Sequence, residues 1–329
     1  MKRRDFLQKT VLSAGVLAME GLNRTAEIDA AEAETEKPGD NPPRLPRRPY
    51  GKSGIDLSII GFGGIVVMNA EQKHANGVVA EAVEKGVNYF DVAPTYGDAE
   101  VKLGPALAPY RKKVFLACKT TQRQREGAAE ELKNSLKRLG TDYFDLYQLH
   151  ALTDVKKDVD VAFAQGGAME TFMEAKKSGQ IRHLGFSAHT EEAALAAMER
   201  YDFDSILFPI NFTCFLKGKF GPRVIKKARS QGLSCLALKA LCRQQWPPDD
   251  PQRQKYSKCW YQPVTDREEA ELALRFTLSQ PITAAIPPGE EELFRLALDL
   301  ALNFKPITEE QIKSLEALAA DLKPIFATA

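Results

Sequence analysis

Short apolar runs alternate with amphipathic stretches along most of the chain from residue 57 onward. The apolar runs predict strands, and stretches with apolar residues every three or four positions predict helices. The predicted strands cover residues 57–63, 87–93, 113–119, 145–150, 181–187, 205–211, 233–239 and 282–287. The clearest helical periodicity covers residues 72–86, 125–140, 167–179, 190–201, 221–232 and 266–280.

Eight strands separated by helices predict a parallel sheet that closes into a TIM (β/α)8 barrel. A doubly wound sheet is the alternative, but the glycines after the first strand do not form a G-x-G-x-x-G turn. Residues 47–58 predict a hairpin across the barrel floor, and residues 308–323 predict an extra C-terminal helix. The proline-rich stretch 243–264 predicts a long loop over one end of the barrel.

The N-terminus has a different pattern. Arg3 and Arg4 precede a short apolar run at residues 10–19, and a small-residue, acidic stretch follows with a candidate cleavage site at residues 31–33. This order resembles a twin-arginine export signal, and the apolar run is shorter than a transmembrane span. The alternative is a basic helix of a protein that stays in the cytoplasm.

The pattern therefore divides the chain into a signal segment (1–33), a proline-rich linker (34–46) and a barrel (47–329). We expect export by the twin-arginine translocase and a periplasmic or membrane-associated location, with a cytoplasmic protein as the alternative. Whether the signal is cleaved or kept as an anchor stays open.

The composition is that of a soluble globular protein, with 44% hydrophobic residues, 27% charged residues and a formal net charge of +1. This balance gives no sign of nucleic-acid binding. The five cysteines are scattered without C-x-x-C spacing, so neither a disulfide framework nor a metal site is expected. The oligomeric state stays open.

Four polar residues stand where predicted neighbouring strands end. Asp91 follows the second strand, Tyr96 lies on its loop, Lys119 closes the third strand and His150 closes the fourth. In such a barrel these positions meet at one face. A nearby ammonium lowers the pKa of a phenol, and a carboxylate holds the ammonium in place. We therefore expect Tyr96 to be a general acid/base tuned by Lys119, with His150 orienting a carbonyl oxygen.

From residue 47 to the last helix the sequence resembles the aldo/keto reductases. The matching motifs are GVNYFDVAPTYGDAE, KVFLACKT, LKNSLKRLGTDYFDLYQLH, GQIRHLGFSAH and ALRFTLSQPITAAIP. The resemblance implies a TIM barrel and a catalytic tetrad of Asp91, Tyr96, Lys119 and His150. It also implies hydride transfer between NAD(P)H and a carbonyl or alcohol substrate such as an aldehyde, a ketone or a sugar.

Cofactor contacts are expected at four further positions. Ser187 matches the family pattern, Arg295 is the cation near the expected 2′-phosphate site, and Lys239 ends the seventh strand. Gly64 permits close approach of the backbone, although a glycine at a strand–loop corner needs no ligand. Two family contacts are altered. Ala188 stands where asparagine usually follows the serine, and apolar residues stand near the usual strand-six glutamine. For Lys239 two roles are open, a contact to the cofactor pyrophosphate or a solvated strand end.

Three acidic residues, Glu290 to Glu292, stand where the family often carries cations for the 2′-phosphate of NADPH. They would repel that phosphate, so NAD(H) is slightly favoured over NADP(H). The same residues also suit the first turn of a helix. A different function class stays open as well, an exported barrel without enzyme activity that binds a ligand or partner. The intact tetrad favours the enzyme.

Overall fold

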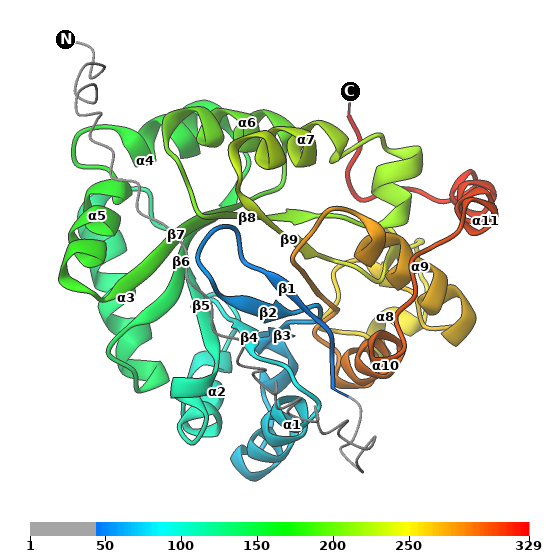
Figure 1. Cartoon of the computed structure of the whole chain (residues 1–329), viewed down its shortest axis with the longest axis horizontal. Helices are drawn as coiled ribbons and strands as arrows, with labels where there is room; N and C mark the ends of the chain where they lie inside the picture. The colour runs from blue at the N-terminus through cyan, green and yellow to red at the C-terminus, as the bar shows by residue number, and fades with distance from the viewer. Residues whose placement is uncertain (1–43, 329) are drawn as a thin grey trace, which may run out of the picture. The chain divides into compact units, whose positions relative to one another are not determined.

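A ring of eight parallel strands with helices outside it forms the centre of the computed structural model, which describes residues 44–328 (Figure 1). The ring strands are β3 (Phe62–Gly63), β4 (Tyr89–Asp91), β5 (Phe115–Thr120), β6 (Phe144–Leu152), β7 (Ile181–Ala188), β8 (Ser205–Pro209), β9 (Ser234–Leu238) and β12 (Ala284–Ile286). Each strand pairs with the next in this order, so the predicted (β/α)8 barrel is confirmed.

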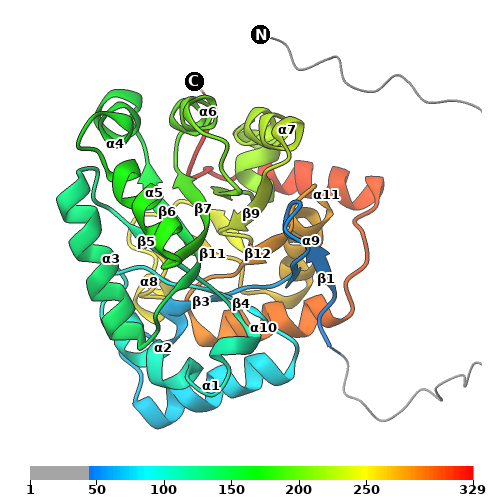
Figure 2. The same cartoon turned by 60° about the vertical axis from the view of Figure 1, so that its left-hand side comes forward.

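Helices follow the strands, and most of them cover the outside of the ring (Figure 2). They are α1 (Gln72–Glu84), α2 (Ala99–Leu107), α3 (Arg125–Leu139), α4 (Val161–Phe163), α5 (Ala168–Ser178), α6 (Glu191–Arg200), α7 (Pro222–Gln231), α8 (Gln252–Lys255), α9 (Arg267–Ser279), α10 (Glu291–Leu302) and α11 (Glu309–Ala319). Helix α11 is the extra C-terminal helix that the sequence predicts, and it begins with a capping box at Thr308. No helix within residues 44–328 is long and apolar enough to cross a bilayer.

The prediction of residues 57–63 as one strand is wrong. This segment divides into β2 (Asp56–Ser58), which pairs with β1 (Arg47–Pro49) in the floor hairpin, and β3 in the ring. Between them Gly61 donates its N–H to the carbonyl of Ala285 (2.9 Å) and so joins the two edges of the ring. A Cβ at Gly61 would meet the Tyr89 ring at 2.5 Å, which explains why glycine stands at this junction.

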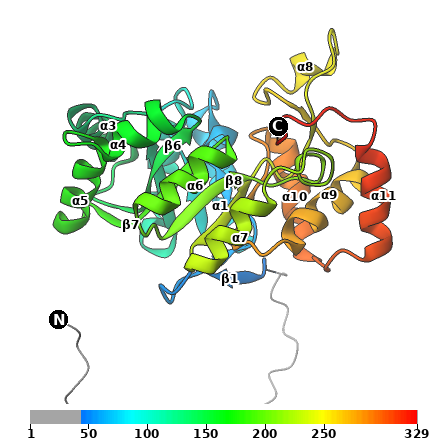
Figure 3. The same cartoon turned by 90° about the horizontal axis from the view of Figure 1, so that it is seen from above.

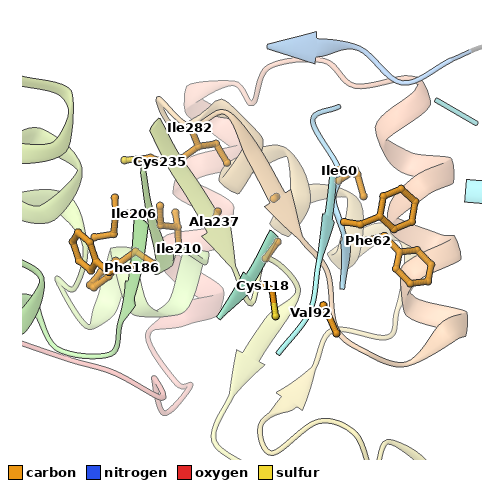
Figure 4. Packing of buried hydrophobic residues seen from close by; sticks show 14 of the residues in the cluster. Ile60, Phe62, Val92, Cys118, Phe186, Ile206, Ile210, Cys235, Ala237 and Ile282 are labelled. Atoms are coloured by element: carbon orange, nitrogen blue, oxygen red, sulfur yellow. The ribbon is translucent and has the colours of Figure 1, made fainter. Parts of the chain in front are cut away.

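Two apolar layers hold the barrel together. One lies inside the ring and joins the hairpin residues Tyr50 and Leu57 to inward-facing side chains such as Leu146 and Leu236. The other packs the outer face of the strands against the helices, as Figure 4 shows for Phe62, Phe186, Ile206 and others. The floor hairpin is also bonded to the ring, because Tyr50 Oη donates to Ser205 Oγ (2.9 Å). The apolar filling closes the lower end, so the open end is the one at which the strands terminate.

The long loop after β9 contains a short hairpin, β10 (Cys242–Gln244) with β11 (Gln262–Pro263), and helix α8 (Figure 3). Residues that follow α11 return toward this loop, because Gln245 N donates to the carbonyl of Lys323 (2.9 Å). The predicted signal segment, residues 1–33, and most of the linker lie outside the described residues.

Candidate active site

A cavity of about 200 Å³ lies at the carboxyl ends of the ring strands. It is smaller than the roughly 300–1,000 Å³ of drug-sized ligand sites, so it admits a small molecule or one end of a larger ligand. Six residues singled out from the sequence line it: Asp91, Tyr96, Lys119, His150, Ser187 and Lys239.

A buried ion pair forms the base of the cavity. Lys119, with no exposed side-chain area, donates to Asp91 Oδ1 and to the carbonyl of Val92 (3.2 Å). The other carboxylate oxygen of Asp91 accepts from Gln148 Nε2 (3.0 Å) and Tyr89 Oη (3.3 Å). Burial lowers the pKa of Lys119, but the charge and hydrogen bond of Asp91 together with Tyr96 and Cys118 outweigh it, and the net pKa is raised. The lysine is therefore held charged.

Tyr96 lies above this pair, with its ring centroid 5.1 Å from Lys119 Nζ and 5.9 Å from the His150 ring in an edge-on arrangement. The sequence suggests that Lys119 depresses the phenol pKa. Burial outweighs the ammonium, so the pKa of Tyr96 is raised instead. The expectation of a depressed pKa is therefore wrong, and Tyr96 carries its proton throughout the neutral range.

An irregularity in β6 sets the position of His150. The β6–β7 register shifts between Leu149 and Leu152, and Ala151 has a positive φ of 54°. This strained turn is held by two bonds: Ala151 N donates to Ser187 Oγ (2.7 Å), and Arg123 Nη2 donates to the carbonyl of His150 (2.7 Å). Because Ser187 Oγ accepts from Ala151, its own O–H remains available as a donor.

The two histidines of the cavity are neutral. Burial and then the positive charge of Lys119 lower the pKa of His150 to about 2. Burial and then the positive charge of Lys239 lower the pKa of His189 to about 3. Each ring therefore has one N–H donor and one acceptor nitrogen at neutral pH.

Lys239 lies directly after β9 and has a positive φ of 65°, which is unusual for a lysine. Its Nζ is 3.3 Å from His189 Nε2 and lies over the rings of Trp260 (5.4 Å to the centroid) and Phe326 (5.9 Å). Trp260 comes from the long loop and Phe326 from the segment after α11. Lys239 is therefore directed to the cavity, as a ligand-binding lysine would be.

Two residues that the sequence assigns to the cofactor are placed elsewhere. Arg295 forms ion pairs with Glu81 (2.9 Å) and Glu291 (3.1 Å) and does not line the cavity. Gly63 lines the cavity, whereas Gly64 packs behind it, where an added Cβ would meet Val92 at 2.6 Å. Close packing thus accounts for Gly64 without a ligand.

Sequence reasoning did not identify several contributors to the site. Tyr89 and Gln148 each stand two positions before a predicted site residue, and the period of two along a strand places them on the same face. That signal could have found them. Phe326 gives no such signal, because it reaches Lys239 and His189 from the irregular segment after α11, far in sequence from the barrel strands.

A TIM barrel with a lysine–carboxylate pair, a phenol and an imidazole at the ends of neighbouring strands defines a class of enzymes that act on carbonyl groups. The sequence model of the aldo/keto reductase family matches residues 60–244. The chain belongs to this family and is an oxidoreductase, and aldo/keto reductases generally use nicotinamide cofactors.

Similar proteins are found over most of the chain. The uncharacterized oxidoreductase YqkF of Bacillus subtilis is 27% identical over 301 residues, 82% of this chain and 95% of that protein. The L-galactose dehydrogenase of Arabidopsis thaliana is 23% identical over 316 residues, 85% of this chain and 96% of that protein. The holo form of aldo-keto reductase AKR11C1 from Bacillus halodurans has the same fold, with a TM-score of 0.64 and 23% identity over 84% of this chain and 96% of that one.

The neutral histidines predict a pH dependence of stability. In the unfolded chain His150 and His189 bind protons near pH 6.5, whereas in the folded protein their pKa values are about 2 and 3. The unfolded state therefore binds more protons below pH 6.5, and stability falls as the pH is lowered. Between pH 7 and pH 5 we expect each histidine to reduce the free energy of unfolding by about 2 kcal/mol.

The measurement is urea unfolding of the wild type and of His150→Gln at pH 7 and pH 5. The variant should lose about 2 kcal/mol less over this interval. Equal losses in the two proteins would contradict the lowered pKa of His150.

Proposed function

We propose that the enzyme catalyses reduction of the carbonyl group of a small aldehyde, ketone or sugar in this cavity, with Tyr96 as the proton donor. One observation supports this above the others: a protonated phenol, a charged lysine and a neutral imidazole line one small cavity. As the carbonyl carbon accepts a hydride, negative charge develops on its oxygen. His150 donates a hydrogen bond to that oxygen, and Tyr96 transfers its proton to it.

Lys119 completes this step. Proton transfer leaves a phenolate on Tyr96, and the adjacent ammonium stabilises that charge. Asp91 keeps Lys119 charged and in place, and Gln148 and Tyr89 hold Asp91. In the reverse direction the same phenolate accepts the proton of an alcohol.

A reduced nicotinamide cofactor, when bound in this cavity, would supply the hydride. Apolar side chains of Leu207 and Ile286 line the cavity and suit the face of a nicotinamide ring, and Ser187 has a free O–H for its carboxamide. Gly63 has no side chain, so the backbone at this position can approach the cofactor closely. These residues fit the reacting end of the cofactor.

Replacing the phenol tests the proposed proton donor. In Tyr96→Phe we expect kcat for carbonyl reduction to fall about 10²–10⁴-fold, because the general acid is lost while the fold is kept. NAD(P)H binding, followed by fluorescence titration, should persist. Tyr261→Phe is the matched control, because Tyr261 also lines the cavity but lies on the loop. Equal activity in the wild type and Tyr96→Phe would refute the role of Tyr96, whereas no activity in either protein would favour a barrel without enzyme activity.

We propose further that NADH is bound more tightly than NADPH. Helix α10 begins directly after the cavity residues 287–289, and its first turn carries Glu291 and Glu292. Arg295, the cation nearest in sequence, is paired with Glu81 and Glu291. The 2′-phosphate of NADPH would therefore meet negative charge at this turn.

The cofactor preference is measured by titrating the protein with NADH and NADPH. We expect a lower Kd for NADH in the wild type, and about a tenfold gain in NADPH affinity in Glu291→Lys/Glu292→Lys. The control is Glu309→Lys/Glu310→Lys, which makes the same charge change at the first turn of α11. A wild type that binds NADPH more tightly contradicts this preference.

We also propose that the chain is exported through the twin-arginine translocase to the periplasm or to the membrane surface. The support is the sequence pattern of Arg3, Arg4 and the apolar run after them. Export of a folded protein with its cofactor bound would be consistent with a nicotinamide enzyme outside the cytoplasm.

Replacing the two arginines tests export. In Arg3→Lys/Arg4→Lys we expect the protein to accumulate in the cytoplasm, whereas the wild type is found in the exported fraction. Immunoblots of fractionated cells measure this, and Lys2→Arg is the control because it leaves the pair intact. A wild type found in the cytoplasm would make the protein an ordinary reductase, and export that is unchanged in Arg3→Lys/Arg4→Lys would contradict the twin-arginine route.

A further inference from the structure

The charges that line the cavity do not balance. Three lysines, Lys119, Lys239 and Lys258, face it together with one carboxylate, Asp91. Lys119 is paired with that carboxylate, and Lys258 Nζ donates to the carbonyl of Val66 (2.8 Å). None of the ion pairs formed within residues 44–328 includes Lys239. The positive charge of Lys239 is therefore left without an anionic partner.

Lys239 is partly buried and has few acceptors around it. Two aromatic rings, Trp260 and Phe326, lie within 6 Å of its Nζ, and within residues 44–328 the one side-chain acceptor for Nζ is His189 Nε2 at 3.3 Å. Because His189 is neutral, it accepts a hydrogen bond but supplies no negative charge. A partly desolvated ammonium of this kind gains strongly from an anion brought into the cavity.

The position of Lys239 favours an anion on the substrate. Lys239 and His150, the imidazole proposed to hold the carbonyl, line the same cavity of about 200 Å³. The charge of Lys239 also contributes to the lowered pKa of His150, after burial, Lys119 and His189. In a nicotinamide cofactor a ribose separates the pyrophosphate from the reacting ring. An anion that lies close to the carbonyl is therefore better explained as a group of the substrate than as the cofactor pyrophosphate.

We propose that Lys239, supported by His189, binds the carboxylate of the substrate, so that the enzyme reduces small aldehyde acids or keto acids. This deepens the proposed function and rests on it. The carbonyl group lies at Tyr96 and His150, and the carboxylate lies at Lys239. Since the cavity is about 200 Å³, the acid has only a few carbons.

The test compares 4-oxobutanoate with its uncharged methyl ester. In the wild type kcat/KM should be higher for the acid. In Lys239→Met the acid-to-ester ratio should fall about 10–100-fold, the loss of one charge-assisted hydrogen bond. Lys239→Arg should retain part of the preference. Lys313→Met, an exposed lysine on α11, is the control and should keep the wild-type ratio. An unchanged ratio in Lys239→Met overturns the proposal.

Titration with NADH and NADPH distinguishes the cofactor as the source of the anion. If Lys239→Met weakens cofactor binding and lowers kcat/KM equally for acid and ester, the lysine binds the pyrophosphate and the substrate proposal is wrong. Thermal unfolding of Lys239→Met and Lys239→Arg shows whether either variant is misfolded. If Lys239→Met is misfolded, the acid-to-ester ratio of folded Lys239→Arg decides. A retained preference for the acid supports a role for the positive charge, and a lost preference contradicts it.

The pH dependence gives a second readout. Burial lowers the pKa of Lys239 to about 8, and Cys242, Cys214, Lys119 and His189 are the titratable groups that face it. As the pH rises through this value the charge is lost, so the acid-to-ester ratio should decline above about pH 8 in the wild type and stay level in Lys239→Met.

A binding measurement separates this inference from the proposed reduction. Calorimetric titration with butanoate, which cannot be reduced, should show binding to the wild type and to Tyr96→Phe but weaker binding to Lys239→Met. Carboxylate binding without reduction of either substrate would remove the proposed function and leave the carboxylate site. Reduction of the ester without butanoate binding would support the proposed function and remove the carboxylate site.

Discussion

The ion pair between Lys119 and Asp91 is the interaction on which the rest of the site depends. Both side chains are almost completely removed from water, and breaking such a pair costs about 3–5 kcal/mol because one charge is left uncompensated. Hydrogen bonds from Gln148 and Tyr89 to Asp91, and from Lys119 to the carbonyl of Val92, offset the cost of burying the pair. These bonds join three neighbouring strands, β4, β5 and β6, so the pair also fixes their relative register at the base of the cavity.

The same pair determines the protonation of its neighbours. With Asp91 bound to Lys119, little negative charge remains to stabilise a second cation, and burial then favours the neutral forms of His150 and His189. Burial likewise keeps the proton on Tyr96. The result is a site of neutral donors over a charged lysine, which is arranged to receive negative charge. An oxyanion that forms during reduction and a carboxylate on the substrate both gain from this field.

Sequence reasoning found the tetrad because parallel strands end at one face of a barrel, and the hydrophobic runs mark those ends clearly. It failed where tertiary contacts determine the conformation or the pKa of a residue. Residues 57–63 form one apolar run, yet the chain bends at Ile59 and the run divides between β2 and β3. Arg295 follows the last strand closely in sequence, but the helical geometry of α10 directs it to Glu81 instead. The pKa of Tyr96 depends on burial by the long loop and other segments, which no local pattern records.

Backbone strain marks two places where the barrel departs from its regular form. Ala151 and Lys239 both have a positive φ, which costs a non-glycine residue free energy, and both lie at the cavity end of the ring, within or directly after a strand. At Ala151 the strain is offset by the bond to Ser187 and repositions His150. At Lys239 the described residues offer only a neutral imidazole and aromatic rings in return. An unpaired charge held in a strained conformation within a catalytic cavity is best explained by a ligand that supplies the missing anion.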